Sequence, residues 1–183
     1  MLFPAENFVG KNGTHYTLRS PELADAEQMI AYLKTTAEET EFGLSYPEEL
    51  NFTIKDEEDF ISNFAADKGS IMISAFDGER LVGNASLSCV MDRTKTLHRA
   101  TFGIAILKSE WAQGLGGKIL AELIKFAKQA GYETIELEVA SSNTTAINLY
   151  KKFGFVVYGE RPHSLKLKSG NYYGELLMAL NIK

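Results

Sequence analysis

The spacing of apolar and polar residues predicts helices in the first third of the chain. Residues 15–19 alternate as a short strand does, and Pro21 then opens a predicted helix that runs to about Thr40. Its apolar positions lie three or four apart, at Leu23, Ala26, Ile30 and Leu33. Residues 42–51 contain Gly43 and Pro47 and are predicted to form a loop. The acidic run 56–59 starts a second helix, since acids favour a helix N-terminus.

The middle of the chain has the period of strands. Residues 70–76 and 80–87 flank the turn signal Asp77-Gly78 and predict a hairpin. Polar residues 92–95 mark another turn. Residues 98–107 then form a strong strand candidate, with Phe102, Ile104 and Ile106 on one face.

A glycine-rich segment, residues 111–117, separates that strand from a predicted helix that Gly131 ends. The apolar face of this helix carries Ile119, Leu120, Leu123, Phe126 and Ala127. A strand over 134–139, a short helix over 144–153 and strands over 155–167 and 172–180 follow. The order β-α-α-β-β-β-α-β-α-β-β predicts a single mixed α/β or α+β domain spanning residues 1–183.

Composition narrows the class of partner. The 183 residues carry a net charge of −5, so nucleic acid is not expected as a partner, because phosphate neutralisation needs a basic face. An acidic surface favours a cationic substrate, although most of the excess of acidic residues is expected only to keep the surface solvated. No segment has the roughly 18 uninterrupted apolar residues of a membrane helix, and no membrane association is expected.

Reactive side chains are sparse. Cys89 is alone, lies in an apolar run and is predicted to be a buried strand residue; with no secretory signal at the N-terminus, it fits a reducing cytoplasm. The three histidines lack the spacing of metal ligands, so no metal site is expected.

The glycine-rich segment is the clearest candidate binding element. Gly114, Gly116 and Gly117 lie where a strand passes into a helix, and free N–H groups at a helix start suit phosphate or pyrophosphate. Ile119 stands where a dinucleotide fingerprint needs its third glycine, and also where a P-loop needs Ser or Thr. A phosphate-bearing cofactor of another kind is therefore favoured over a plain tight turn, although the glycines alone favour it modestly.

Topology places a second segment beside this one. Strand, helix and next strand form a right-handed βαβ unit, and ligands bind outside the carboxyl ends of such strands. Residues 141–143, and the short helix with Asn143, Ala146 and Tyr150, are therefore expected beside the phosphate site.

The glycine-rich segment and the short helix that follows it in the chain resemble motifs of the GCN5-related N-acetyltransferase (GNAT) superfamily. Trp111-Ala112-Gln113-Gly114-Leu115-Gly116 is similar to its Arg/Gln-x-x-Gly-x-Gly/Ala acetyl-CoA motif. Residues 143–155 are similar to its Asn-x-x-Ala-x-x-Leu-Tyr-x-Lys-x-Gly-Phe signature. The ordered pair is specific, and the close match covers roughly residues 98–157. One departure is Trp111, which stands at the leading Arg or Gln position and puts a side-chain contact there in doubt.

The resemblance implies a mostly antiparallel sheet with one splayed parallel pair, about four helices, and transfer of acetyl from acetyl-CoA to an amine. It implies that Tyr150 protonates the departing thiolate and that N–H groups near Ile106 polarise the thioester. From helical spacing alone Tyr150 reads as a core residue, and Asn143 as a helix N-cap. The implied cofactor-binding residues are Ile104, Ala105, Ile106, Gln113, Gly114, Leu115, Gly116, Gly117, Lys118, Asn143, Ala146 and Tyr150.

The acceptor and the base remain open in the sequence. Glu138, Glu41, His98 and a water relay are alternatives for the base, and residues 36–50 are expected to meet a small-molecule or protein amine. A non-catalytic acyl-CoA-binding regulatory module is the competing class, and a phosphate-binding module unrelated to CoA is disfavoured by residues 143–155. A homodimer is compatible with either class.

Overall fold

The computed structural model describes all of residues 1–183. Eight strands form one sheet with four α-helices around it. The strands are β1 Glu6–Val9, β2 His15–Arg19, β3 Ile71–Asp77, β4 Arg80–Cys89, β5 Arg99–Ile106, β6 Thr134–Ala140, β7 Val156–Lys166 and β8 Tyr172–Asn181. The helices are α1 Ala26–Glu39, α2 Ile54–Ala66, α3 Leu115–Gln129 and α4 Thr144–Lys152, and the short 3-10 turns are η1 Leu23–Asp25, η2 Pro47–Glu49 and η3 Lys108–Glu110.

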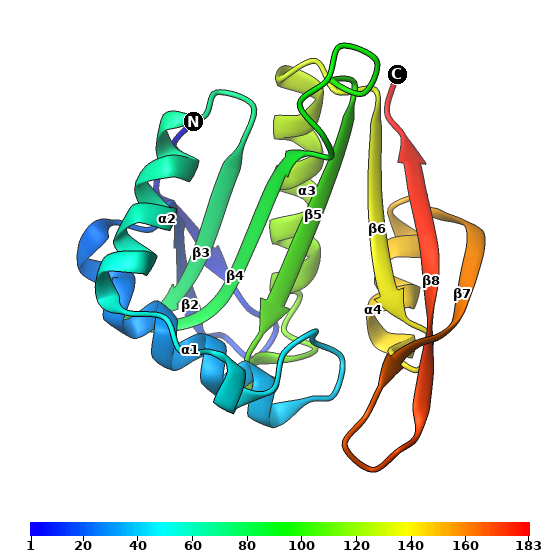
Figure 1. Cartoon of the computed structure of the whole chain (residues 1–183). Coiled ribbons are helices and arrows are strands. Elements are labelled where there is room, and N and C mark those ends of the chain that lie inside the picture. The colour runs from blue at the N-terminus through cyan, green and yellow to red at the C-terminus, as the bar shows by residue number, and fades with distance from the viewer.

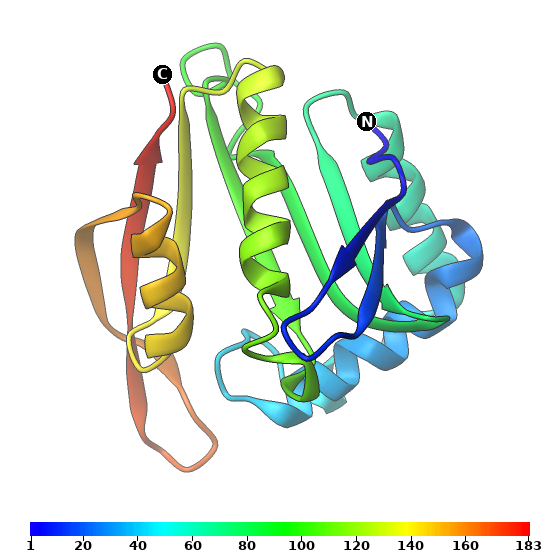
Figure 2. The ribbon, with the colours of Figure 1, turned by 180° about the vertical axis from the view of Figure 1, so that it is seen from behind.

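The sheet has the order β1-β2-β3-β4-β5-β6-β8-β7, and every neighbouring pair is antiparallel except β5 and β6. Helices α1 and α2 cover one face (Figure 1). Helices α3 and α4 cover the other, which Figure 2 shows from behind. The predicted fold class is therefore confirmed: a mixed, mostly antiparallel sheet with one parallel pair and four helices.

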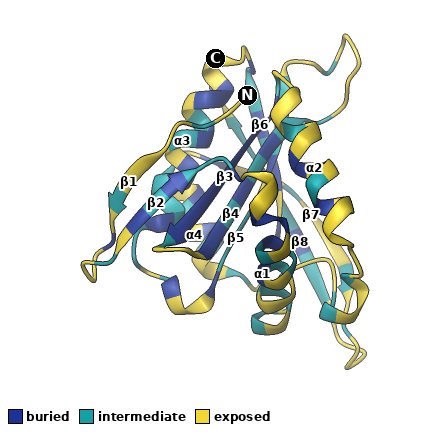
Figure 3. Cartoon of the chain, turned by 90° about the vertical axis from the view of Figure 1, so that its left-hand side faces the viewer, coloured by how far each residue is buried: buried dark blue, intermediate teal, exposed yellow.

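The core lies between the sheet and its helices. Burial is greatest along the central strands, and exposed residues lie on the outer faces of the helices and along the edge strand β7 (Figure 3). In α3 the buried positions are those that the helical period predicts, and the helix ends just before Gly131, as expected. They include Ile119, Leu120, Leu123, Phe126 and Ala127.

Three details differ from the sequence prediction. Strand β1 was not foreseen; it has four residues and gains its hydrogen bonds only by pairing with β2. Helix α1 begins at Ala26 and not at Pro21, because the Asp25 carboxylate accepts from the Glu22 N–H at 2.7 Å and holds η1 before it. Cys89 is half-buried at the end of β4 and not fully buried. None of the helices has the length and apolarity needed to cross a membrane.

Candidate active site

Strands β5 and β6 pair over only three residues. Their register runs from Arg99 opposite Thr134 to Thr101 opposite Glu136, and beyond it the two strands separate. Figure 1 shows the resulting gap, which widens toward the carboxyl ends of both strands. Strand β4 stays paired with β5 up to Ile106, so only the edge of β5 that faces β6 loses its partner.

The backbone groups that face this gap follow from the register. The Leu107 N–H donates to the Val82 carbonyl at 2.9 Å, and every second residue of an antiparallel pair points its N–H and C=O away from the partner strand. Ile104 and Ile106 therefore direct their backbone groups toward β6. The Ile106 carbonyl is occupied, because it accepts from the Trp111 indole N–H at 2.8 Å. The N–H groups of Ile104 and Ile106 remain as donors in the gap.

A tyrosine hydroxyl is inserted between β4 and β5 at the same level. Tyr32 of α1 donates to the Ala105 carbonyl at 2.6 Å and accepts from the Asn84 N–H at 3.1 Å. It bridges two groups that lie opposite each other in the register. Tyr32 was not among the residues predicted from the sequence, because its place on the apolar face of α1 signals only burial.

The glycine-rich segment forms a sharp turn into α3. Gly114 has a φ of 88°, which a residue with a side chain adopts only under strain, and Ala112 already has a φ of 63°. The first hydrogen bond of the helix runs from the Lys118 N–H to the Gly114 carbonyl at 3.0 Å. The N–H groups of residues 115–117 precede it and have no backbone acceptor, so they are free donors at the positive end of the helix.

A cavity of about 810 Å³ joins the gap to this helix start. It is lined by the loop 40–50, the end of β5, the glycine-rich segment, the end of β6 and α4. All of the predicted site residues lie on its wall except two, Gln113 and Lys118. The Gln113 side chain accepts from the Asn12 N–H at 3.0 Å, and the Lys118 ammonium forms ion pairs with Glu6 and Glu122.

Tyr150 differs from every other buried tyrosine. Tyr16, Tyr32 and Tyr132 donate to Glu110, to Ala105 O and to Gly69 O respectively. Tyr150 is only 7% exposed, yet its hydroxyl makes no hydrogen bond within the chain and the residue lines the cavity. Burial raises the pKa of Tyr150 to about 12. The hydroxyl is not one of the atoms sealed away from solvent without a partner, so it is open to the cavity and available to a ligand.

The Tyr150 ring is held by aromatic packing. Its centroid lies 5.6 Å from that of Phe102 on β5 and 5.9 Å from that of Phe155, both in tilted or edge arrangements. Asn143 caps the same helix, since its side-chain oxygen accepts from the Ala146 N–H at 3.1 Å. Its side-chain nitrogen has no partner in the chain, so the cap leaves one polar group facing the cavity.

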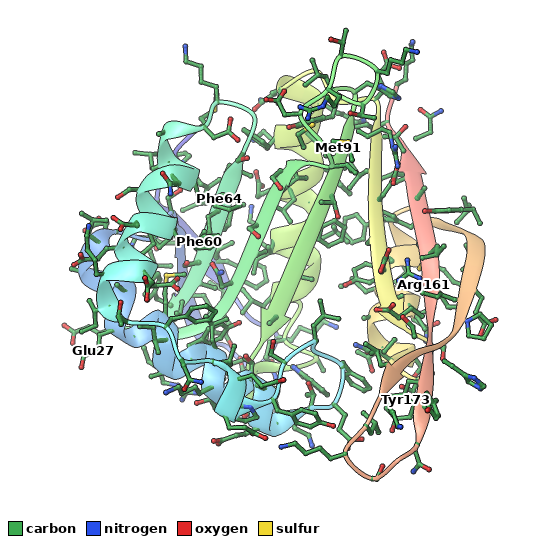
Figure 4. All side chains as sticks on the ribbon, viewed as in Figure 1. Glu27, Phe60, Phe64, Met91, Arg161 and Tyr173 are labelled. Atoms are coloured by element: carbon green, nitrogen blue, oxygen red, sulfur yellow. The ribbon has the colours of Figure 1, made fainter.

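The candidate bases lie in different places. Glu138 lines the cavity, but Arg161 binds it with two hydrogen bonds of 2.7 and 2.8 Å and lowers the pKa of the carboxyl, which weakens it as a base. Glu41 accepts from the Tyr173 hydroxyl at 3.1 Å. His98 precedes β5 at the opposite end of the strand, about 26 Å from Ile106 at the usual rise. Figure 4 shows Arg161 and Tyr173 on β7 and β8, across the gap from β5.

The end of the cavity beneath the loop 40–50, where the amine acceptor is expected, is called the acceptor side. Contacts between this loop and the β7–β8 hairpin bridge it. The loop 40–50 crosses from α1 toward the hairpin of β7 and β8, where the Tyr46 hydroxyl accepts from the Lys168 N–H at 2.8 Å. The Lys168 ammonium also pairs with Glu48 and lies 4.1 Å from the centre of the Tyr46 ring. These contacts hold the loop over the cavity.

The sheet order, its single splayed parallel pair and the glycine-led helix at the splay define the acetyltransferase class of fold. Residues 31–155 match the acetyltransferase (GNAT) family. The chain belongs to this family.

Named relatives and solved structures similar to this chain are also acetyltransferases. An L-amino acid N-acetyltransferase of Escherichia coli is 31% identical over 110 residues, covering 59% of this chain and 65% of that protein. An N-alpha-acetyltransferase of Sulfurisphaera tokodaii is 27% identical over 154 residues, or 79% and 83% of the two chains. A GNAT-family acetyltransferase from Streptococcus pneumoniae superposes with a TM-score of 0.87 at 27% identity, over 91% and 99% of the chains. A Salmonella typhimurium acetyltransferase, solved with its cofactor acetyl-CoA, shares the fold with a TM-score of 0.80 at 18% identity, over 92% and 94%.

Proposed function

We propose that residues 1–183 form one domain that transfers an acetyl group from acetyl-CoA to the primary amine of a small molecule or of a protein. The observation that carries the proposal is Tyr150, a residue buried in the cavity wall whose hydroxyl is hydrogen-bonded to nothing in the chain. A protein that only bound acyl-CoA would gain nothing from a proton donor there.

The chain has the groups that acetyl-CoA needs. The unpaired edge of β5 offers the N–H groups of Ile104 and Ile106 to the pantetheine arm, as an added strand would use them. The free N–H groups of residues 115–117 suit the diphosphate, to which Gly114 allows close approach. The side chain of Asn143 and the backbone near Ala146 meet the arm from α4.

The acyl transfer has a simple balance. The neutral amine attacks the thioester carbon, a C–N bond forms and the C–S bond breaks. The N–H of Ile106 stabilises the oxyanion, and Tyr150 gives its proton to the thiolate. The proton that the nitrogen loses as the amide forms passes to water, from which Tyr150 regains its proton. The pKa of Tyr150, about 12, exceeds the ordinary pKa of a thiol, about 8.5, so proton transfer from the phenol to the thiolate is uphill. Desolvation in the cavity raises the pKa of the departing thiol as well, and this reduces the difference between the two pKa values.

Deprotonation of the amine is assigned to water. Strand β5 has no acid along its splayed part, and Glu138 is held as an ion pair by Arg161. Glu41, whose partner in the chain is the neutral Tyr173 hydroxyl, favours a cationic amine by Coulomb attraction without acting as the base.

The test separates binding from turnover. Purified protein is titrated with acetyl-CoA by calorimetry, and thiol release is then followed with a panel of amino acids, polyamines and short peptides. Binding with turnover of at least one amine supports the proposal. Binding without any turnover replaces it with the non-catalytic acyl-CoA-binding module, and an absence of binding removes both.

A further inference from the structure

The turn between β1 and β2 is fastened to the glycine-rich segment. The Lys11 N–H donates to the Gln113 carbonyl at 3.2 Å, and the Asn12 N–H donates to the Gln113 side-chain oxygen at 3.0 Å. Figure 2 shows this hairpin beside the start of α3. These contacts bring Lys11 and Gly114, about a hundred positions apart in the sequence, to the same cavity.

Gly10 makes this close approach possible. A Cβ atom on Gly10 would lie 2.7 Å from the Tyr16 ring and 3.4 Å from the Gln113 Cβ, and Tyr16 is fully buried and cannot retreat. The ion pair of Glu6 with Lys118, at 2.7 Å, fastens the hairpin to α3 a second time. The position of the turn is thus fixed from two sides.

The segment itself offers no free cation to an anion at its N–H groups. Lys118 is neutralised by Glu6 and Glu122. Trp111 uses its only donor on the Ile106 carbonyl. The amides of residues 115–117 carry only partial charges, so a full positive charge beside them would strengthen their hold on a diphosphate.

Lys11 meets this need. Lys11 lines the cavity with Gly114, is exposed, and forms no ion pair. The one acid on this part of the wall, Glu110, is already bound by Tyr16 at 2.8 Å and Arg80 at 3.3 Å, so it does not compete for Lys11. A lysine on a flexible stem is a point charge that can follow a phosphate over several positions.

We propose that Lys11 binds the diphosphate of acetyl-CoA, supplying from the N-terminal hairpin the positive charge that the glycine-rich segment lacks. The inference rests on the proposed function, since it presumes acetyl-CoA in the cavity. It adds a binding residue that lies outside the segment matched to the family.

The experiment measures acetyl-CoA affinity by calorimetry at low salt for the wild type, Lys11→Met and Lys11→Arg. Lys11→Met is expected to bind about fivefold to tenfold more weakly, and Lys11→Arg to recover most of the loss. The loss shrinks as salt is raised, because the contact is exposed. The matched control is Lys95→Met, an exposed lysine in the β4–β5 loop at the other end of the sheet, which is expected to leave affinity unchanged.

Fragments of the ligand locate the contact. Acetyl-3′-dephospho-CoA keeps the diphosphate and is expected to show the same loss with Lys11→Met, whereas S-acetylpantetheine has no phosphate and is expected to show none in competition. Equal affinity of Lys11→Met and wild type for acetyl-CoA would overturn the inference. So would a loss that persists with S-acetylpantetheine, or one that vanishes without the 3′-phosphate. If the wild type itself fails to bind acetyl-CoA, the proposed function fails first, and circular dichroism shows whether any variant has unfolded.

Discussion

Replacing Tyr150 with phenylalanine removes a single oxygen atom from the cavity wall. The ring keeps its contacts with Phe102 and Phe155, and no hydrogen bond within the chain is lost. The free energy of unfolding should therefore change by less than about 0.5 kcal/mol. If Tyr150 is the general acid, the rate should fall by about 100-fold, the low end for such a group because a thiolate is a good leaving group. That is about 2.7 kcal/mol in the activation free energy.

Tyr132→Phe is the matched control. Tyr132 is as buried as Tyr150, but its hydroxyl donates to the Gly69 carbonyl at 2.7 Å, far from the cavity. Its loss should cost about 1 kcal/mol of stability and lower the melting temperature by about 2–4 °C, with turnover unchanged. Tyr150→Phe is thus expected to lower the rate without lowering stability, and Tyr132→Phe to lower stability without lowering the rate.

The assay is thiol release under saturating acetyl-CoA, with melting temperatures from calorimetry on the same samples. Affinity for acetyl-CoA should differ little between Tyr150→Phe and wild type. Turnover of Tyr150→Phe within twofold of wild type would remove Tyr150 as the acid. A large fall in its melting temperature would show that the hydroxyl has a structural partner and would contradict its assignment as free for a ligand.

Three further predictions concern the fold and the acceptor side. Tyr32→Phe leaves the Ala105 carbonyl and the Asn84 N–H unbridged, and should lower stability by about 2 kcal/mol and the melting temperature by about 4–8 °C; an unchanged value contradicts the bridge. Tyr46→Phe frees the Lys168 N–H and should raise the KM for the amine by about threefold with acetyl-CoA affinity unchanged, in steady-state kinetics. The four buried tyrosines have pKa values raised by burial above the unfolded value of 10.0, so their contribution to stability is complete below pH 10 and is lost as pH rises toward 12 and beyond. Unfolding with phenolate absorbance should begin above pH 10, and stability that holds to pH 12 would contradict the shifts.

Local patterns predicted the fold well where a single segment contains its own signal. Helix α3 has both its apolar face and its glycine-rich start in the sequence, and the turn signal Asp77-Gly78 marks the β3–β4 hairpin, whose turn residues are Gly78 and Glu79. Strand β1 carries no such signal, because its four residues depend on β2 for pairing. The resemblance implied the splay of β5 and β6, but the residue at which pairing stops, Thr101, is set by packing and could not be read from the strand itself.

In the candidate site, too, some residues were predictable from local sequence motifs and others only from tertiary contacts. The cavity gathers Ile104, Gly114, Asn143 and Tyr150, which the two sequence motifs and the strand before them had indicated, although their roles stay predictions. Lys11 was not foreseen, since a lysine in a Gly-Lys-Asn-Gly turn looks like any surface turn. Only the contacts with Gln113, made by residues distant in the chain, bring that turn to the cavity.

In the gap between β5 and β6, the edge of β5 has unpaired backbone groups inside the molecule. An unpaired edge at the rim of a sheet invites another chain to add to it and so promotes aggregation. Here the edge is recessed between two halves of one sheet, joined below by three residue pairs, and the loop 40–50 lies over its mouth. A polypeptide strand with side chains on both faces would not enter easily, whereas a slender linear ligand with amide groups would. The recess that keeps other chains from the strand edge thus also favours a slender linear ligand, which is the shape of the proposed cosubstrate.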